Sequence, residues 1–114
     1  MRIAKFHLYL ADLNPHRGTE PGKVRPVAVV QTDLLNNIHP STIVCPITSH
    51  VIREAQFLRV HLSAGRPTGL REASDILVDQ IRAIDNRRFK KQIGHLSKRQ
   101  REHLLENLEI LVLE

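Results

Sequence analysis

The sequence has no tryptophan, and its three phenylalanines and one tyrosine make up only 4% of 114 residues. This composition argues against a single-strand nucleic-acid site built as a platform of stacked aromatic rings. The one cysteine, Cys45, excludes an internal disulfide, and its position in an apolar run predicts a small core residue rather than a nucleophile. No apolar stretch approaches the roughly 18 residues of a membrane span, and the N-terminus carries no signal-peptide pattern. We therefore expect a soluble, cytoplasmic protein with no membrane partner.

Metal and nucleotide motifs are missing as well. The seven histidines are spread along the chain, and none forms an H-x-x-x-H or Cys/His cluster of the kind that binds zinc. The sequence has neither a Walker-type phosphate loop nor a nucleophile elbow. We expect no metal and no cofactor.

Acidic residues are in the minority, with 12 Asp and Glu against 17 Lys and Arg, which gives a net charge of +5 with histidine neutral. Such a balance favours an anionic partner, either a nucleic acid or an acidic protein. Residues 87–101 carry seven Lys and Arg residues and no acidic one. This run is interpreted either as a solvated face or as a docking patch. With 114 residues, the chain 1–114 is expected to form one domain with a single modest core.

Apolar periodicity predicts a series of short strands. Alternation over Phe6 to Leu13 predicts a half-buried strand, and the apolar run Val27 to Val30 predicts a strand buried on both faces. The expected strands are Phe6 to Leu13, Val27 to Gln31, Thr42 to Ile47, Phe57 to Leu62 and Ile76 to Ile84. The last of these has a spacing that also fits a helix, and its β-branched content favours the strand. A short turn over Glu72 to Asp75 is expected before it.

A helix is expected at the C-terminus. Ser97 and Gln100 form a capping box, and an apolar stripe follows at helical spacing, made of Leu104, Leu105, Leu108, Leu111 and Val112. Strands followed by one amphipathic helix predict a mainly β fold, a small curled antiparallel sheet capped by that helix. Pro46 inside the third strand is expected at a sheet edge or a bulge, and a bulge would direct Thr48 and Ser49 towards a site.

Arg25 stands at the junction between a glycine-rich loop and the second strand. Pro26 disfavours helical backbone at Arg25, so the guanidinium is expected at the rim of the sheet, where it suits a phosphate. The alternative without a function is an ordinary solvated arginine at the start of a strand. About ten residues separate the first strand from Arg25, whereas a hairpin needs about two to five. The loop, which carries Glu20, is therefore expected to be a binding element or lid.

These segments together resemble the MazF/PemK-like toxins, the sequence-specific endoribonucleases of type II toxin–antitoxin pairs. The matching segments occur in the family's order and cover nearly all of the chain. They are Asp12-Leu13-Asn14-Pro15, Gly18-Thr19-Glu20, Arg25 to Val30, Pro46-Ile47-Thr48-Ser49, Gly69-Leu70, Val78 to Asp85 and Ile93-Gly94-His95-Leu96. The chain departs from the pattern at Tyr9, where a tryptophan is common, and at Pro21, where a glutamine is usual.

The resemblance implies an SH3-like barrel with a C-terminal helix, working as a homodimer. It also implies cleavage of single-stranded RNA without a metal, leaving a 2′,3′-cyclic phosphate and a 5′-hydroxyl. Because RNA carries its own nucleophile, the protein has only to position it, move protons and stabilise the phosphorane. The residues that match the family's catalytic pair are Arg25 and Thr48.

The resemblance and the neighbouring chemistry add a set of RNA-binding or supporting residues. They are Gly18, Glu20, Lys23, Ser49, His50 and Gln80. The general base stays open. Glu20 is able to orient Arg25 or to take the proton, while His50 offers an imidazole, a side chain that often serves as a general base, but it is not part of the family pattern. Asp79 and Gln80 match a family pair, although a structural role at a strand end accounts for them equally well.

Two alternatives remain beside the nuclease. Toxins of the same fold bind and poison DNA gyrase without cutting RNA, and a degenerate, inactive binding module is also conceivable. The pair Arg25 and Thr48 favours the nuclease, because a gyrase poison does not need it. As a partner the resemblance implies an antitoxin, expected to be acidic and to fold a disordered tail against the basic surface, displacing the loop Gly18–Lys23.

Overall fold

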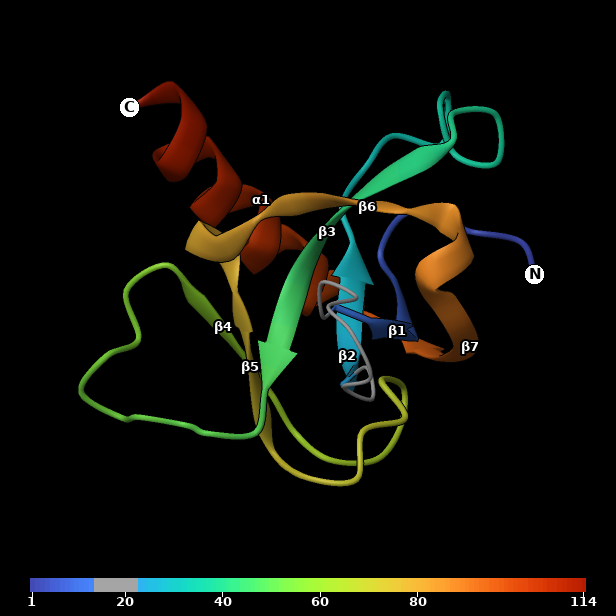
Figure 1. Cartoon of the computed structure of the whole chain (residues 1–114). Helices are drawn as coiled ribbons and strands as arrows, with labels where there is room; N and C mark the ends of the chain where they lie inside the picture. Colours follow the sequence, from blue (N-terminus) through green and yellow to red (C-terminus); the bar gives the residue numbers. More distant parts are fainter. Residues whose placement is uncertain (14–22) are drawn as a thin grey trace.

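The computed structural model describes residues 1–13 and 23–114, in which seven strands surround a common centre and one α-helix closes the chain (Figure 1). The strands are β1 (His7–Asp12), β2 (Val24–Val29), β3 (Ser41–Thr48), β4 (Arg59–Leu62), β5 (Ser74–Leu77), β6 (Arg82–Asp85) and β7 (Phe89–His95). Two short 3-10 helices, η1 (Val78–Gln80) and η2 (Asn86–Arg88), precede β6 and β7, and α1 spans Lys98–Leu113. The predicted mainly β fold with a C-terminal helix is confirmed.

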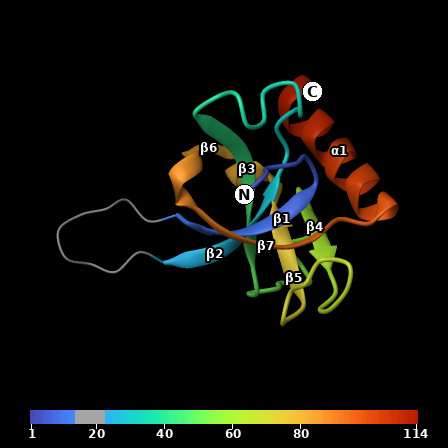
Figure 2. The same ribbon diagram turned by 90° about the vertical axis from the view of Figure 1, so that its right-hand side faces the viewer.

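The strands form one antiparallel sheet in the order β4-β5-β3-β2-β1-β7, and β6 also pairs with β3. Within the described part of the chain β4 and β7 are the two ends of this order and do not pair with each other, so the sheet is curled but not closed. Helix α1 packs against β4 and η1 and lies on one side of the curled sheet (Figure 2). None of the described helices is long and apolar enough to cross a membrane.

The central strands bury both of their faces. On one side, Leu8 of β1 packs with Ala28, Cys45 and Leu104 of the helix; on the other, Tyr9 packs with Val27, Val44 and Phe89. The predicted half-buried first strand is therefore wrong, since Leu8 and Tyr9 point to opposite faces and are both fully buried. The prediction of a second strand buried on both faces is confirmed by Val27, Ala28 and Val29.

Tyr9 is a core residue with a satisfied hydroxyl. Its oxygen accepts a hydrogen bond from the Ala4 N–H at 2.8 Å and donates to the Arg2 carbonyl at 3.1 Å. The Phe89 ring meets its ring edge-on, with centroids 5.3 Å apart. The departure from the family pattern at this position is thus accommodated in the core, where a phenol needs a polar partner.

The run Ile76 to Ile84 is not one strand. Strand β5 ends at Leu77, η1 turns the chain, and β6 begins at Arg82. Both strands then pair with β3, β6 opposite Ser41 to Val44 and β5 opposite Ile47 and Thr48. The predicted turn at Glu72 to Asp75 is wrong in its second half, because Ser74 and Asp75 already belong to β5.

Pro46 pairs with Val27 of β2 on one side and with no strand on the other, so it lies at a local edge, and the pairing shows no bulge there. The carbonyl of Ile43 points towards β2, where it accepts a hydrogen bond from Val30 N–H. Backbone groups alternate in direction along a strand, so the backbone nitrogen of Pro46, three residues later, points away from β2. On that side β6 has ended at Val44 and β5 begins only at Ile47. The missing N–H therefore removes no ladder hydrogen bond.

The C-terminal helix begins as predicted. The Ser97 hydroxyl accepts from Gln100 N–H at 3.2 Å, and the Gln100 side-chain oxygen accepts from Ser97 N–H at 2.7 Å, which completes the capping box. The expected apolar stripe holds only in part. Leu104 is fully buried, whereas Leu105 and Val112 are 44% and 67% exposed. The C-terminal half of the helix thus presents apolar side chains to solvent.

Candidate active site

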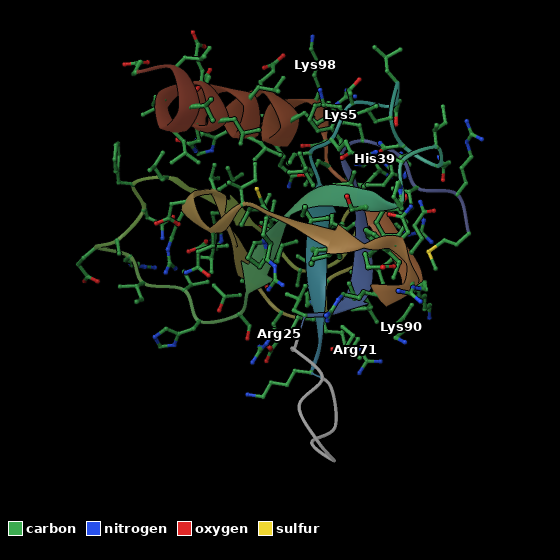
Figure 3. All side chains as sticks on the ribbon, turned by 45° about the horizontal axis from the view of Figure 1, so that its top comes forward. Lys5, Arg25, His39, Arg71, Lys90 and Lys98 are labelled. Carbon is green, nitrogen blue, oxygen red and sulfur yellow. The ribbon has the colours of Figure 1, made fainter. Side chains whose placement is uncertain are left out.

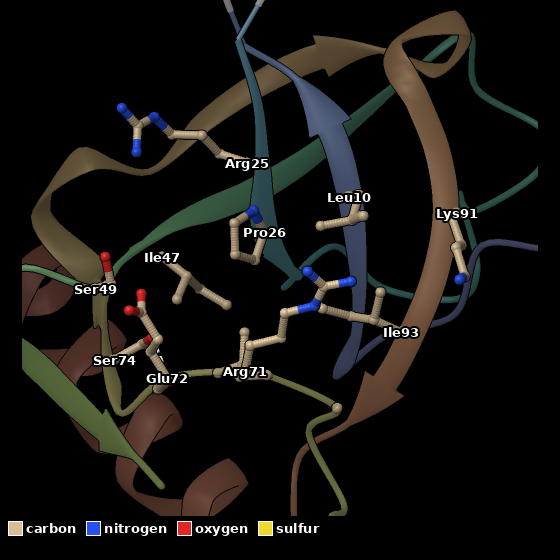
Figure 4. A pocket seen from close by; sticks show the side chains of 12 residues that line it. Leu10, Arg25, Pro26, Ile47, Ser49, Arg71, Glu72, Ser74, Lys91 and Ile93 are labelled. Carbon is tan, nitrogen blue, oxygen red and sulfur yellow. Dashed lines mark hydrogen bonds between the residues drawn. The ribbon is translucent and has the colours of Figure 1, made fainter. Parts of the chain in front are cut away.

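The candidate site lies where strands β2 and β3 part. Their pairing ends at Val27 and Pro46, beyond which β3 continues along β5 while β2 continues along β1. Between the diverging ends lies a pocket with a volume of about 460 Å³. Arg25 from β2 and Ser49, directly after β3, both line it (Figure 4). The structure therefore brings these two predicted site residues together.

The pocket has an apolar floor and a charged rim. Leu10, Pro26, Ile47, Leu70 and Ile93 supply apolar side chains from five parts of the chain. The charged residues around it are Arg25, Arg71, Glu72 and Lys91, all exposed. Figure 4 shows Arg25 and Arg71 on different walls of this pocket. Three cations against one carboxylate favour an anionic ligand, and the floor offers a surface for a flat apolar group.

The segment that carries Arg71 is held against β7. Gly69 has a φ of +76°, and a Cβ at this position would collide with the backbone carbonyl of Ile93. Pro67 accepts a hydrogen bond from His95 N–H at 3.0 Å, and Leu70 accepts from Gly65 N–H at 2.8 Å. Only glycine combines this backbone conformation with so close an approach, so Gly69 fixes where Leu70 and Arg71 meet the pocket.

Sequence reasoning missed Arg71, Glu72 and Lys91. Two signals were present: Arg71 directly follows the Gly69-Leu70 motif, and Lys91 belongs to the basic run 87–101. Neither signal indicates that the segment with Arg71 and the segment with Lys91 line the same pocket, because they are brought together only by the tertiary fold. Figure 3 shows Arg25 and Arg71 at the same end of the molecule, far from Lys98 at the start of α1.

Thr48 is the last residue of β3 and lies beside the pocket rather than among its lining residues. Its hydroxyl accepts a hydrogen bond from His50 N–H at 3.1 Å. Val27 and Pro46 are paired, and paired residues point to the same face of a sheet. Arg25 lies two residues before Val27 and Thr48 two residues after Pro46. Side chains two residues apart share a face, so Arg25 and Thr48 point to the same side of the sheet.

The other predicted site residues are more scattered. Lys23 precedes β2, is exposed, and accepts from Leu13 N–H through its carbonyl at 3.2 Å. His50 and Gln80 are exposed and do not line the pocket, and Gln80 is the last residue of η1. Gly18 and Glu20, like Pro21, lie outside the described residues. Their proposed roles stay predictions.

Cys45 is fully buried in the core, as the sequence predicted. Burial, and secondarily the nearby carboxylate of Asp79, raises the pKa of its thiol to about 12. The sulfur therefore stays protonated and acts as a small apolar group. Among the described residues, no three His, Cys, Asp or Glu side chains are grouped so that they could hold a metal ion.

A curled antiparallel sheet with one C-terminal helix is the fold that the resemblance to MazF-type toxins implies. The sequence profile of PemK-like, MazF-like toxins of type II toxin–antitoxin systems matches residues 4–112. The chain belongs to this family.

Individual relatives agree with that assignment. The chain is 37% identical over 110 residues to Endoribonuclease EndoA of Bacillus subtilis (strain 168), which covers 96% of this chain and 94% of that protein. MazF from Deinococcus radiodurans superimposes with a TM-score of 0.78 at 22% identity, over 98% of this chain and 97% of its own. Mycobacterium tuberculosis toxin MazF-mt6 gives a TM-score of 0.77 at 24% identity, over 92% and 94%. The fold is thus that of MazF toxins.

Proposed function

We propose that this chain is the toxin of a type II toxin–antitoxin pair and a metal-independent endoribonuclease that cuts single-stranded RNA at specific sequences. The observation that carries the proposal is Arg25, an exposed guanidinium on the wall of a basic pocket, facing the same side of the sheet as Thr48. The similarity to an endoribonuclease over nearly the whole chain supports the same activity.

The reaction uses the substrate's own nucleophile. The 2′-oxygen forms a bond to the adjacent phosphorus and gives up its proton to a base, while the bond from phosphorus to the 5′-oxygen breaks. The leaving 5′-oxygen takes up a proton, so the products are a 2′,3′-cyclic phosphate and a 5′-hydroxyl. Arg25 donates paired hydrogen bonds to the phosphate oxygens and neutralises the charge that builds up on the phosphorane. Thr48 holds a phosphate oxygen or the 2′-hydroxyl in line for attack.

The general base has two candidates. Glu20 precedes β2 in the sequence, outside the described residues, and is proposed either to orient Arg25 or to accept the proton. His50 follows Thr48 by two residues and is exposed. Arginine itself is a poor base because its guanidinium stays protonated. The scheme needs no metal, because the nucleophile comes from RNA and the positive charge from the guanidinium.

The pocket beside Arg25 is proposed to bind nucleotides next to the scissile bond. Arg71 and Lys91 supply positive charge for flanking phosphates, and the floor formed by Leu10, Pro26 and Ile93 supplies an apolar surface for a base. Gly18, Glu20, Lys23, Ser49 and Gln80 are proposed to contribute to RNA binding around this centre.

The direct test is incubation of the purified protein with a long RNA in EDTA. We expect cleavage at a few sites, 5′-hydroxyl ends, and no cleavage of an RNA with a 2′-deoxy nucleotide at the scissile position. Undiminished cutting of the deoxy substrate would contradict the 2′-hydroxyl mechanism. Absence of cleavage, together with inhibition of DNA gyrase, would favour the gyrase-directed alternative.

A homodimer is proposed as the working form. An apolar surface runs from the C-terminal half of α1 to β3 and the segment before it, and includes Leu35, Ile43, Leu105, Val112 and Leu113, each at least 38% exposed. A patch of this kind on a soluble domain marks a contact surface, and a second copy of the chain offers a matching one. Sedimentation of the protein and of a Leu105→Glu, Val112→Glu variant tests this, because a variant that stays dimeric would exclude this surface.

An acidic antitoxin is proposed as the other protein partner. The solved neighbours include a MazE–MazF complex from Deinococcus radiodurans, with a TM-score of 0.77 at 22% identity. Binding of an acidic segment near Arg25 would compete with RNA and would weaken as salt rises. Equilibrium binding of a labelled, uncleavable RNA to the toxin, alone and in its complex, measures this competition. Equal affinity in both would contradict it.

A further inference from the structure

A buried carboxylate stands next to the end of β3. The side chain of Asp75 on β5 is completely buried, and its residue lies opposite Thr48 on one side and His61 of β4 on the other. Its oxygens are 2.9 Å from His61 Nδ1, 3.0 Å from Gln56 Nε2 and 3.1 Å from Arg59 Nη1. Burial alone would raise the pKa of Asp75, but the hydrogen bonds from His61, Gln56 and Arg59 outweigh it and lower the pKa. The group is therefore a charged acceptor held by three donors.

Two of these donors also hold the connection between β3 and β4. Gln56 Nε2 donates to the Ile52 carbonyl at 2.8 Å, and Arg59 Nη1 donates to the His50 carbonyl at 3.3 Å. The connection itself runs away from the sheet (Figure 1), and residues 52–57 are all exposed, including Phe57 at 77%. Since apolar packing contributes little to it, these polar contacts are important anchors of the segment.

The anchored segment begins at the candidate active site. Ser49 lines the pocket, and His50 N–H donates to the Thr48 hydroxyl while the His50 carbonyl accepts from Arg59. The position of Thr48 to His50 is thus linked through Arg59 to the carboxylate of Asp75. Moving a donor away from a buried carboxylate leaves its charge unpaired, which costs free energy. The charge of Asp75 therefore favours the arrangement in which its three donors stay in place.

We propose that Asp75 is a positioning residue: through Gln56 and Arg59 it fixes the connection after β3, and so sets where Thr48 and Ser49 stand for RNA cleavage. The effect on RNA cleavage rests on the proposed nuclease function. The anchoring of the connection by Asp75 rests only on the hydrogen bonds described above. It predicts that loosening the anchor slows the chemical step more than it weakens RNA binding, because the cations Arg25, Arg71 and Lys91 are left in place.

The experiment compares Asp75→Asn, Gln56→Ala and their double variant with a matched control, Asp85→Asn. Asparagine keeps the size of Asp75 but removes the charge and places an amide N–H₂ among donors. Gln56 is exposed, so its loss leaves the core intact. Asp85 is another paired carboxylate, 3.0 Å from Arg87 Nη2, but lies away from the connection at the β6 end. Each variant is examined by backbone hydrogen exchange, by its unfolding free energy, and by kcat and KM with RNA.

We expect faster exchange in residues 49–58 for Asp75→Asn and Gln56→Ala, with exchange in β1 and β2 unchanged. We expect kcat to fall on the order of 10-fold for Asp75→Asn and less for Gln56→Ala, with KM changed by less than about 2-fold. The double variant should lose less activity than the product of the two single effects, since Gln56 acts in part through Asp75. Asp85→Asn should behave as the unmodified protein.

Three results would overturn the proposal: unchanged exchange in residues 49–58, a loss of kcat no larger than the unfolded fraction explains, or single effects that simply multiply in the double variant. If the unmodified protein cuts no RNA, the nuclease proposal fails. The exchange measurement then still decides whether Asp75 anchors the connection.

Discussion

Val27 and Pro46 are the last residues that β2 and β3 pair with each other, and the candidate site opens directly beyond them. Ile47 and Thr48 pair with β5 instead, while Val24 and Arg25 stay paired with β1. The two strand ends are therefore held by different neighbours, which keeps them apart without leaving either strand unsupported. Arg25 is thus carried by the strand that stays with β1, and Thr48 by the strand that joins β5.

Arg25→Ala is expected to abolish nearly all RNA cleavage while the fold survives. Arg25 is exposed near the start of β2, so its removal leaves the core unchanged. Loss of one electrostatic contact to the transition state should lower the cleavage rate about 100-fold or more. Arg25→Lys tests the paired hydrogen bonds, because it keeps the charge but not the fork of donors. Single-turnover cleavage and thermal unfolding of both variants check this, and a fully active Arg25→Ala would remove Arg25 from the mechanism.

Thr48→Ala and His50→Ala are expected to differ. Thr48 shares a sheet face with Arg25, so loss of its hydroxyl should slow cleavage by about 10- to 100-fold. His50 is exposed and outside the pocket, so its loss should cost less than about 3-fold, far below the 100-fold or more of a general base. Cleavage rates across pH for both variants are the measurement. A His50→Ala variant as inactive as Arg25→Ala would make His50 the base.

The features that sequence predicted are those that depend on local chemistry. The capping box of Ser97 and Gln100 was predictable because both partners lie within one helical turn, and Arg25 was placed at a strand mouth because Pro26 restricts the backbone before it. The burial of Cys45 followed from the apolar residues around it.

Features that depend on neighbouring strands were not predictable. The break in Ile76 to Ile84 occurs because β5 and β6 pair with different ends of β3, and the apolar spacing of that run contains no sign of it. Asp75, a carboxylate beside a serine, has the local sequence of a turn, and its burial depends on donors that lie 14 to 19 residues away. Arg71 and Lys91 come to the pocket from separate segments for the same reason.

The stability of the fold should fall in acid partly through Asp75. Its folded pKa lies below the ordinary value of 3.8, so its contribution is complete above that pH and is lost as the pH falls through the folded pKa. The unfolding free energy of the unmodified protein should therefore exceed that of Asp75→Asn at pH 7, and the difference should shrink below about pH 4. Denaturant unfolding from pH 7 to pH 2 measures it, with Glu106→Gln on the exposed surface of α1 as the control. A difference that stays constant over this range would show that the charge of Asp75 does not contribute.

Arg71 and Lys91 are expected to act on RNA binding rather than on the chemical step. Both are exposed at the pocket and neither is next to Arg25 in the chain, so Arg71→Ala and Lys91→Ala should raise KM and leave kcat nearly unchanged. If each cation contacts one phosphate, each substitution should also reduce the slope of log affinity against log salt by about 1. The control is Lys98→Ala, which removes an exposed cation at the opposite end of the molecule, where it lies 3.9 Å from Glu102 (Figure 3).

The salt slope separates a phosphate contact from a general effect of net charge. Arg71→Ala, Lys91→Ala and Lys98→Ala each lose one positive charge. If RNA affinity depends only on net charge, its salt dependence should change equally in all three variants. Affinity for an uncleavable RNA, measured at several salt concentrations, distinguishes the two cases. Slopes for Arg71→Ala and Lys91→Ala that match that of Lys98→Ala would exclude the pocket from RNA binding. A reduced slope in these two variants alone would place the RNA backbone along the wall between β7 and the segment after Gly69.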